Sequence, residues 1–301
     1  VRKAPSVYGC DITPRTVSAG LWRDVDLEID SPNEFEALYL ATRSLEKEGA
    51  LVTCAFRFKT DVPYYAGLSL RLTGTVDGEA GFLVEQPVRF VGGRFDFTVK
   101  NPKLWWPNGY GAANVYDVRA ELLQDGRVIA VRETTMGIRT VKLDRTDVTD
   151  QYQGEFCFVV NGEKILCKGS NWVPADAMHS RDAARYERML EMWVDTGCNI
   201  LRCWGGNVYE DHLFYDYCDR HGIMIWNDFT MACGMYPLDE TFLDAIRKEA
   251  EVVVEKLRNH PSIILWSGDN ECDALMLALS GQNPEWNRIT REVLPQVVNR
   301  L

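Results

Sequence analysis

From about residue 155 onward the sequence alternates short apolar segments with amphipathic helical segments, and this alternation limits the possible folds most. The helical segments end at Gly197, at Gly222 and at the pair His260-Pro261. The apolar segments are ILCKGS (165–170), NILRCW (199–204), IMIWNDF (223–229) and SIILWS (262–267), followed by a last helical pattern around 286–298. Continuously apolar strands are typical of sheets covered on both faces. The pattern predicts a parallel sheet, either open and doubly wound or part of a (β/α)8 barrel.

The preceding part of the chain, from about residue 20 to 142, has a different pattern. Short runs in which apolar and polar residues alternate are separated by turn signals, among them Asp77-Gly78, Gly92-Gly93 and Asp125-Gly126. Alternation with a period of two at this spacing predicts an antiparallel β-sandwich of about 100 residues. The residues before Asp30 contain too few strands to form a domain by themselves.

Polar or aromatic residues follow each apolar segment of the second half. They are Asn171 and Trp172, Gly205-Gly206-Asn207, Asn227-Asp228 and Asp269-Asn270-Glu271. In parallel α/β folds this edge of the sheet is where ligands bind. No glycine-rich fingerprint begins any of the helices, so the sequence does not predict a nucleotide site.

Several of these residues allow two interpretations. Arg202 and Trp204 lie two residues apart on one strand and share a face, where the guanidinium needs a partner, either in a structural ion pair or in an active site. Trp172, Trp204 and Trp226 are of a type that stacks on sugar rings but more often belongs to the core. Glu271 is either a general acid or an ordinary loop residue. Glycoside hydrolysis needs two carboxyl groups, so Glu271 alone does not decide between these interpretations.

Composition limits the partners. The formal charge of −11 and the lack of a basic stripe argue against nucleic acid. No apolar run approaches the ~20 residues of a membrane-spanning helix, so we expect no membrane partner. The four histidines show no metal-ligand spacing, and the nine cysteines include no CxxC pair. We therefore expect no metal, no cofactor and reduced thiols, which favour the cytoplasm over the periplasm; a chain beginning at Val1 leaves a signal peptide undecided.

Seven segments, in this order, make the chain resemble glycoside hydrolase family 2 and, within it, the β-mannosidase branch. They are YGCDITPR…AGLWRDVDLE (8–28), LWWPNGYG (104–111), MGIRTV (136–141), KGSNWVPADA (168–177), NILRCWGGNVYE (199–210), LFYDYCDRHGIMIWNDF (213–229) and RNHPSIILWSGDNE (258–271). The resemblance implies the C-terminal end of a jelly-roll, sugar-binding-like domain at 1–30, an immunoglobulin-like β-sandwich at 31–142 and the N-terminal half of a (β/α)8 TIM barrel at 143–301.

The resemblance also implies roles for individual residues. Glu271 matches the acid/base, and Asn270 matches the neighbour that hydrogen-bonds the 2-hydroxyl of the sugar. Arg202 matches an arginine near the nucleophile, and Trp204 an aromatic wall of the −1 subsite. Asp11 resembles an aspartate that reaches the active site from the first domain. Further substrate contacts are implied for Asn171, Trp172 and Asp176.

The implied function is a retaining, exo-acting glycoside hydrolase that removes terminal β-linked, mannose-like sugars from oligosaccharides or glycoconjugates without a cofactor. The family's nucleophile follows the seventh barrel strand, whereas four strands are predicted here, so we expect this fragment to be inactive. We also expect the other barrel half, or a neighbouring chain, to cover the unpaired strand edges. The alternatives are another family 2 specificity, such as β-galactosidase or exo-β-glucosaminidase, and a non-catalytic carbohydrate-binding or scaffold protein.

Overall fold

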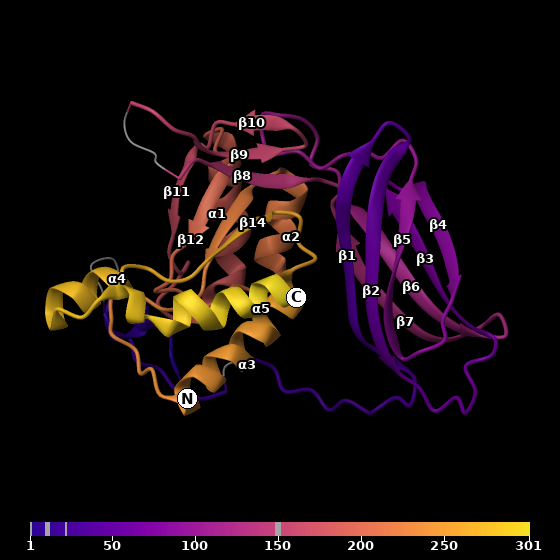
Figure 1. Cartoon of the computed structure of the whole chain (residues 1–301), viewed down its shortest axis with the longest axis horizontal. Helices are drawn as coiled ribbons and strands as arrows, with labels where there is room; N and C mark the ends of the chain where they lie inside the picture. The colour runs from indigo at the N-terminus through magenta and orange to yellow at the C-terminus, as the bar shows by residue number, and fades with distance from the viewer. Residues whose placement is uncertain (1, 10–12, 22, 148–151) are drawn as a thin grey trace.

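The computed structural model describes residues 2–9, 13–21, 23–147 and 152–301. Figure 1 shows a β-sandwich beside an α/β part, joined by an extended segment that begins near the N-terminus and ends at the sandwich. This arrangement confirms the predicted fold class, which is an immunoglobulin-like sandwich followed by half of a TIM barrel. Among the described residues, no helix combines the length and the apolar character that crossing a membrane requires.

The sandwich consists of two antiparallel sheets that face each other. One sheet has the order β1-β2-β5 and the other β4-β3-β6-β7. The strands are β1 (Glu34–Glu46), β2 (Gly49–Lys59), β3 (Leu68–Val76), β4 (Glu79–Pro87), β5 (Gly92–Val99), β6 (Tyr116–Gln124) and β7 (Arg127–Met136). Two of the predicted turns have left-handed backbone, with φ of 54° at Asp77 and 51° at Asp125, each followed by a glycine. Such turns fit tight hairpins because their twist matches that of the strands.

The core of the sandwich follows from the period-two pattern. Along β3, buried residues alternate strictly with partly exposed ones, and Leu70 and Leu72 are fully buried. Val52 of β2 and Leu122 of β6 lie in the same cluster. Alternate side chains along β2, β3 and β6 therefore point inwards and contribute to one apolar layer.

A small antiparallel sheet follows the sandwich in the chain and lies at the top of the α/β part in Figure 1. It contains β8 (Val141–Arg145), β9 (Phe156–Val160) and β10 (Glu163–Ile165) in the order β10-β9-β8. The apolar segment predicted as one strand at 165–170 is split, because Ile165 ends β10 and the parallel strand begins only at Gly169. Residues 166–168 belong to neither strand and separate β10, which pairs antiparallel with β9, from β11, which pairs parallel with β12.

The parallel sheet contains four strands in sequential order. They are β11 (Gly169–Trp172), β12 (Ile200–Cys203), β13 (Met224–Asp228) and β14 (Ile263–Ser267). The intervening helices are α1 (Ala183–Asp195), α2 (His212–His221) and α3 (Glu240–Leu257). Gly222 ends α2 with a left-handed φ of 68°, and the Asp239 carboxylate accepts a hydrogen bond from Phe242 N at the start of α3. This order brings the C-terminal ends of all four strands to one edge.

The C-terminal region covers one side of the α/β part. It consists of α4 (Cys272–Leu275), π-helical segments at Met276–Ser280 and Ile289–Val293, and α5 (Leu294–Arg300). Ile289, Val293 and Val297 are buried in one cluster with Leu243 and Ile246 of α3.

Direct hydrogen bonds connect the sandwich to the segment that precedes β14. The Asn259 side chain accepts from Leu40 N at 3.1 Å and donates to Leu38 O at 2.9 Å, which extends the edge of β1. The Arg139 guanidinium donates to Pro261 O at 2.6 Å and to Ile263 O at 2.7 Å. The two parts of the molecule are therefore held together at the N-terminal end of β14.

Candidate active site

The C-terminal edge of the parallel sheet brings Arg202 next to side chains from the neighbouring strands. Asn171 of β11 and Trp226 of β13 are the register partners of Arg202 on β12. Side chains at paired positions of parallel strands point to the same face. Asn270, which follows β14, joins this group through a hydrogen bond to Arg202.

Arg202 is the centre of the group. Its Nε donates to Asp228 Oδ1 at 3.2 Å, and its Nη2 donates to Asp228 Oδ2 at 2.6 Å. Nη2 also donates to Asn270 Oδ1 at 3.0 Å, and Nη1 donates to Asn171 Oδ1 at 3.3 Å. Cζ lies 5.7 Å from the centre of the Trp226 ring. Arg202 thus forms an ion pair and also contacts two predicted site residues, so the two interpretations of its guanidinium are not exclusive.

Asp228 is the partner that compensates the charge of Arg202. Its side chain is fully buried, and Oδ2 also accepts from Gly205 N at 2.9 Å. Burial raises the pKa of the Asp228 carboxyl above its ordinary value, while the hydrogen bonds and charge of Arg202 act in the opposite direction. The sequence shows Asp228 at the end of an apolar strand, but nothing there distinguishes it from other polar residues at strand ends.

Glu271 has a backbone conformation that is unusual for a glutamate. Of the described non-glycine residues, those with positive φ are Asp77, Asn101, Asp125, Asn161, Cys233 and Glu271. The first four are Asp or Asn, which adopt this conformation readily. Glu271 (φ 59°) and Cys233 (φ 46°) are the exceptions, and they touch each other, with Cys233 Sγ 3.5 Å from Glu271 Oε2. Strained backbone of this kind concentrates at functional sites.

Backbone pairing holds the two strained residues together. Asn270 N donates to Met231 O at 3.0 Å, and Cys233 N donates to Asn270 O at 2.9 Å. The loop after β13 and the loop after β14 are therefore paired, which places Glu271 beside Asn270 at the edge of the sheet. Cys233 could not be recognised from the sequence, because the residues that contact it come from another βα unit.

Trp204 is half-buried and leaves β12 at the same edge. Its ring lies against Gly206, where a Cβ atom would be only 1.9 Å from Trp204 Cζ3. Gly206 therefore has to be a glycine for the ring to keep this position.

Trp172 does not lie with these residues but in a core cluster, so its position does not support its predicted role as a substrate contact. Its side chain is 3% exposed, and its ring centre is 5.0 Å from that of Phe214. Trp172 Nε1 donates to Glu210 Oε1 at 2.8 Å, and the hydroxyl of Tyr186 donates to the other oxygen of Glu210. A ring enclosed in this cluster offers no face to a ligand. Burial raises the pKa of Glu210 to about 7.

Asp176 belongs to a neighbouring cluster. It forms an ion pair with Arg185 at 2.6 Å and accepts from Met178 N at 2.8 Å. With Thr13 and Thr16 it lines a cavity of about 240 Å³ between the N-terminal segment and the loop after β11. Asp176 contacts Arg185 and Met178 rather than the group around Arg202, so its role in binding remains a prediction.

Asp11 lies outside the described residues. The segments on both sides of it dock at the candidate site's edge of the sheet: Ser6 N donates to Gly206 O at 3.0 Å, and Thr16 Oγ1 donates to Ala177 O at 3.3 Å. The N-terminal segment therefore reaches the βα loops of the barrel.

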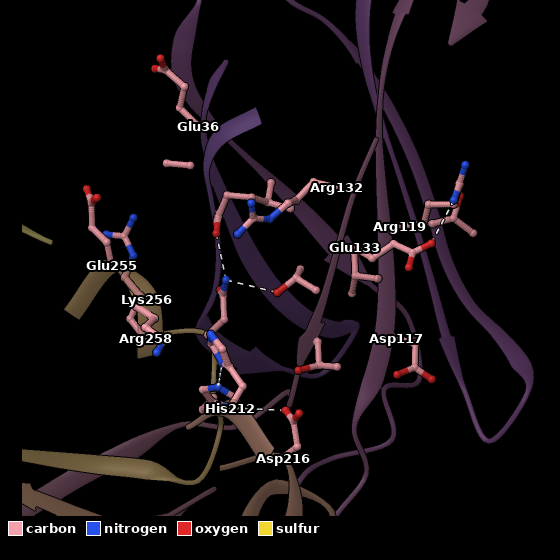
Figure 2. Close-up of a pocket in the computed structure, with 18 of the residues that line it drawn as sticks. Glu36, Asp117, Arg119, Arg132, Glu133, His212, Asp216, Glu255, Lys256 and Arg258 are labelled. Atoms are coloured by element: carbon pink, nitrogen blue, oxygen red, sulfur yellow. Dashed lines mark hydrogen bonds and ion pairs between the residues drawn. The ribbon is translucent and has the colours of Figure 1, made fainter. Parts of the chain in front are cut away.

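A second, larger cavity lies between the sandwich and the barrel. Figure 2 shows Arg132 and Glu133 on the sandwich side, and His212 and Asp216 on α2. The cavity has a volume of about 770 Å³ and contains none of the residues at the strand ends.

A hydrogen-bonded chain of side chains borders this second cavity. Asp219 Oδ2 is 2.7 Å from His260 Nδ1, and His260 Nε2 is 2.8 Å from His212 Nδ1. Among the described residues, Asp216, Asp219 and His260 form the one group whose ligand atoms are close enough for a metal ion. The imidazole nitrogens are already engaged in this chain, which accounts for the grouping without a metal.

Comparisons with known proteins agree with the fold. Residues 36–139 match the family model described as glycosyl hydrolases family 2, and residues 153–293 match the model described as its TIM barrel domain. A β-mannosidase B of Aspergillus clavatus is 35% identical over 99% of this chain, which spans 37% of that protein's length.

Solved structures of glycosidases are also similar to this chain. A β-D-mannosidase from Dictyoglomus thermophilum is 33% identical with a TM-score of 0.89, and the match covers 100% of this chain and 37% of that one. A β-glucuronidase from Bacteroides uniformis, 19% identical with a TM-score of 0.68, covers 84% of this chain and 30% of that one, and shares the fold alone. With two family models that together span most of its residues, the chain belongs to glycosyl hydrolase family 2.

Proposed function

We propose that this chain supplies the acid/base half of the active site of a retaining, exo-acting β-mannosidase. The observation that carries the proposal is the hydrogen bond from Arg202 to Asn270, directly before Glu271, at the C-terminal edge of the parallel sheet. The similarity to β-mannosidases over the whole chain supports the sugar class. The substrate would be a carbohydrate with a terminal β-linked, mannose-like residue.

In the proposed reaction Glu271 acts twice. As an acid it gives its proton to the glycosidic oxygen while a second carboxylate attacks the anomeric carbon, and the bond to the leaving group breaks. As a base it then takes a proton from the water that hydrolyses the glycosyl-enzyme. Asn270 would hydrogen-bond a sugar hydroxyl, and Trp204 would form an apolar wall beside the ring.

The two carboxyl groups would come from different parts of the barrel. The resemblance assigns the nucleophile to the end of a seventh strand, whereas the described parallel sheet has four. We further propose the domain division into 1–30, 31–142 and 143–301. It is supported by the start of β1 at Glu34, the end of β7 at Met136 and the start of β8 at Val141.

The test compares aryl glycosides as substrates for the complete protein that the gene encodes and for the 301-residue chain. We expect the complete protein to hydrolyse aryl β-mannosides faster than the β-galactoside, β-glucosaminide and β-glucuronide. We expect the 301-residue chain to show no turnover. A preference for another glycoside would assign a different specificity. Sugar binding without turnover by the complete protein would favour a non-catalytic role.

Glu271→Gln tests the acid role in the complete protein. A general acid contributes roughly 10²- to 10⁴-fold to the rate, and poor leaving groups need the proton most. We expect the rate on alkyl β-mannosides to fall in this range and the rate on dinitrophenyl β-mannoside to fall much less. An equal loss on both substrates would contradict the role, and Glu191→Gln, on the exposed face of α1, is the control.

A further inference from the structure

Asp228 has a buried carboxylate that the reaction proposed above does not use. Its oxygens face Arg202 Nε and Nη2 and Gly205 N, and its side chain is fully buried. Together with the side chain of Ser267, which also hydrogen-bonds this carboxyl, these three donors surround it with protein groups. Asp228 therefore acts on its neighbours rather than on a ligand.

The contact with Asp228 fixes the plane of the Arg202 guanidinium as well as compensating its positive charge. A guanidinium is flat, and two N–H groups on adjacent nitrogens that bind the two oxygens of one carboxylate set its orientation. Both nitrogens of this pair, Nε at 3.2 Å and Nη2 at 2.6 Å, bind Asp228 in this way. The remaining N–H groups of Arg202 then point in defined directions, towards Asn171 and Asn270.

The orientation of the two amides follows from the chemistry of arginine. A guanidinium has donors and no acceptor. Asn171 and Asn270 must therefore turn their Oδ1 atoms towards Arg202, at 3.3 Å and 3.0 Å, and their NH2 groups away from it. The Nδ2 of Asn270 accordingly lies on the side of Cys233, 3.4 Å from its Sγ, where Glu271 also points.

We propose that Asp228 is a positioning residue: by holding the plane of Arg202, it fixes the amides of Asn171 and Asn270 so that both present N–H donors to the ligand. The sugar oxygens that meet these residues then act as acceptors. The identity of the ligand rests on the proposed function, whereas the orientation of the amides does not.

Asp228→Asn removes the charge and replaces one acceptor oxygen by an NH2 group, which faces an N–H of Arg202. The two-point contact is lost, and the guanidinium and both amides gain freedom to rotate. Asp228→Glu keeps the charge and both acceptors, so it should restore part of the effect. Asp219→Asn is the matched control, because Asp219 is also buried in this part of the molecule and accepts from a backbone N–H, that of Ser262.

The first measurement uses the 301-residue chain without any ligand. Side-chain amide signals of Asn171 and Asn270, assigned with Asn→Asp variants, are recorded by ¹⁵N–¹H NMR for wild type and each variant. We expect these signals to broaden or shift towards values of freely rotating amides in Asp228→Asn, to recover partly in Asp228→Glu and to stay unchanged in Asp219→Asn. Wild-type signals in a folded Asp228→Asn protein would overturn the proposal.

Arg202→Lys keeps the inference testable if Asp228→Asn does not fold. A lysine keeps the ion pair with Asp228 but cannot hold two amides in one plane. The same release of both amide signals is expected, and unchanged signals would overturn the proposal.

The second measurement compares the affinity for methyl β-mannoside with that for its 2-deoxy analogue, by calorimetry on the complete protein. Loss of one oriented hydrogen bond should reduce the preference for the parent sugar roughly 3- to 10-fold in Asp228→Asn. A preference equal to that of wild type would count against the proposal. If wild type binds neither sugar, the proposed function fails, while the NMR result still decides the role of Asp228.

Discussion

At the scale of single residues, Glu210 is a buried carboxyl group away from the candidate site. It is 1% exposed and is held by Trp172 and Tyr186, and burial raises its pKa from the ordinary value of 4.5 to about 7. The folded protein therefore favours the protonated form. The resulting stabilisation is fully present below pH 4.5 and is lost as pH rises through about 7.

Glu210→Gln should remove this pH dependence. Glutamine stays neutral and keeps an oxygen that can accept from Trp172 Nε1. At pH 8 we expect the variant to be more stable than wild type by an amount on the order of 3 kcal/mol, and at pH 4.5 we expect little difference. Urea unfolding between pH 4.5 and 8 measures this, with Glu191→Gln as the exposed control. Parallel stability curves for wild type and Glu210→Gln would contradict the expectation.

The orientation of Trp172 was predictable from its neighbour. Asn171 and Trp172 are consecutive in one strand, so they must point to opposite faces of the sheet. The register puts Asn171 beside Arg202 on the site's face and Trp172 beside Cys203 on the helix-covered face. Arg202 and Asn270 were correctly expected at one edge. The partnership of Arg202 with Asp228 was not predictable, because it depends on which strands are neighbours.

At the scale of elements, the order of strands and helices followed from the sequence, but irregular segments did not. The single helix expected around 286–298 is a π-helical segment, Ile289–Val293, followed by α5. Pro295 lacks an N–H, so it cannot bond to the carbonyl four residues earlier, and the turn before it widens. The apolar periodicity stays intact, because Ile289, Val293 and Val297 still face α3.

The helix α3 depends on its N-cap. The Asp239 carboxylate accepts from Phe242 N at 3.1 Å, whereas Asp211, at the same position before α2, makes no such hydrogen bond. We expect Asp239→Ala to lower the free energy of unfolding by about 0.5–2 kcal/mol and Asp239→Asn to lower it less. Chemical denaturation measures both, with Asp211→Ala as the matched control. A loss in Asp211→Ala as large as that in Asp239→Ala would show that the effect is not one of capping.

At the scale of the whole molecule, sandwich and barrel meet through few but directional contacts. Asn259 makes hydrogen bonds of 3.1 Å and 2.9 Å to the backbone of β1, and Arg139 binds two carbonyls next to β14. The cavity of about 770 Å³ beside them shows that apolar packing does not fill this interface. The fold classes of both parts were predictable from the pattern of apolar and polar residues in the sequence. Their docking was not predictable, because it uses single polar residues in loops.

Asn259→Ala should loosen this docking. It removes both hydrogen bonds to β1, so we expect a loss of about 1–3 kcal/mol and faster proteolysis near residue 140. Asn33→Ala, at an exposed hydrogen bond to Asp61, is the control. Unfolding of the two parts is followed by tryptophan fluorescence and by circular dichroism. Unfolding transitions that remain as in wild type would show that Asn259 does not connect the two parts.

The strand β14 links this docking to the candidate active site. Its N-terminal end is tied to the sandwich by Arg139 and the segment containing Asn259, and its C-terminal end leads within a few residues to Asn270 and Glu271. Five extended residues form a stiff link of roughly 16 Å. β14 therefore connects the contacts of the sandwich to the loop that carries the proposed acid, and we expect a change in how the sandwich docks to shift the position of Glu271.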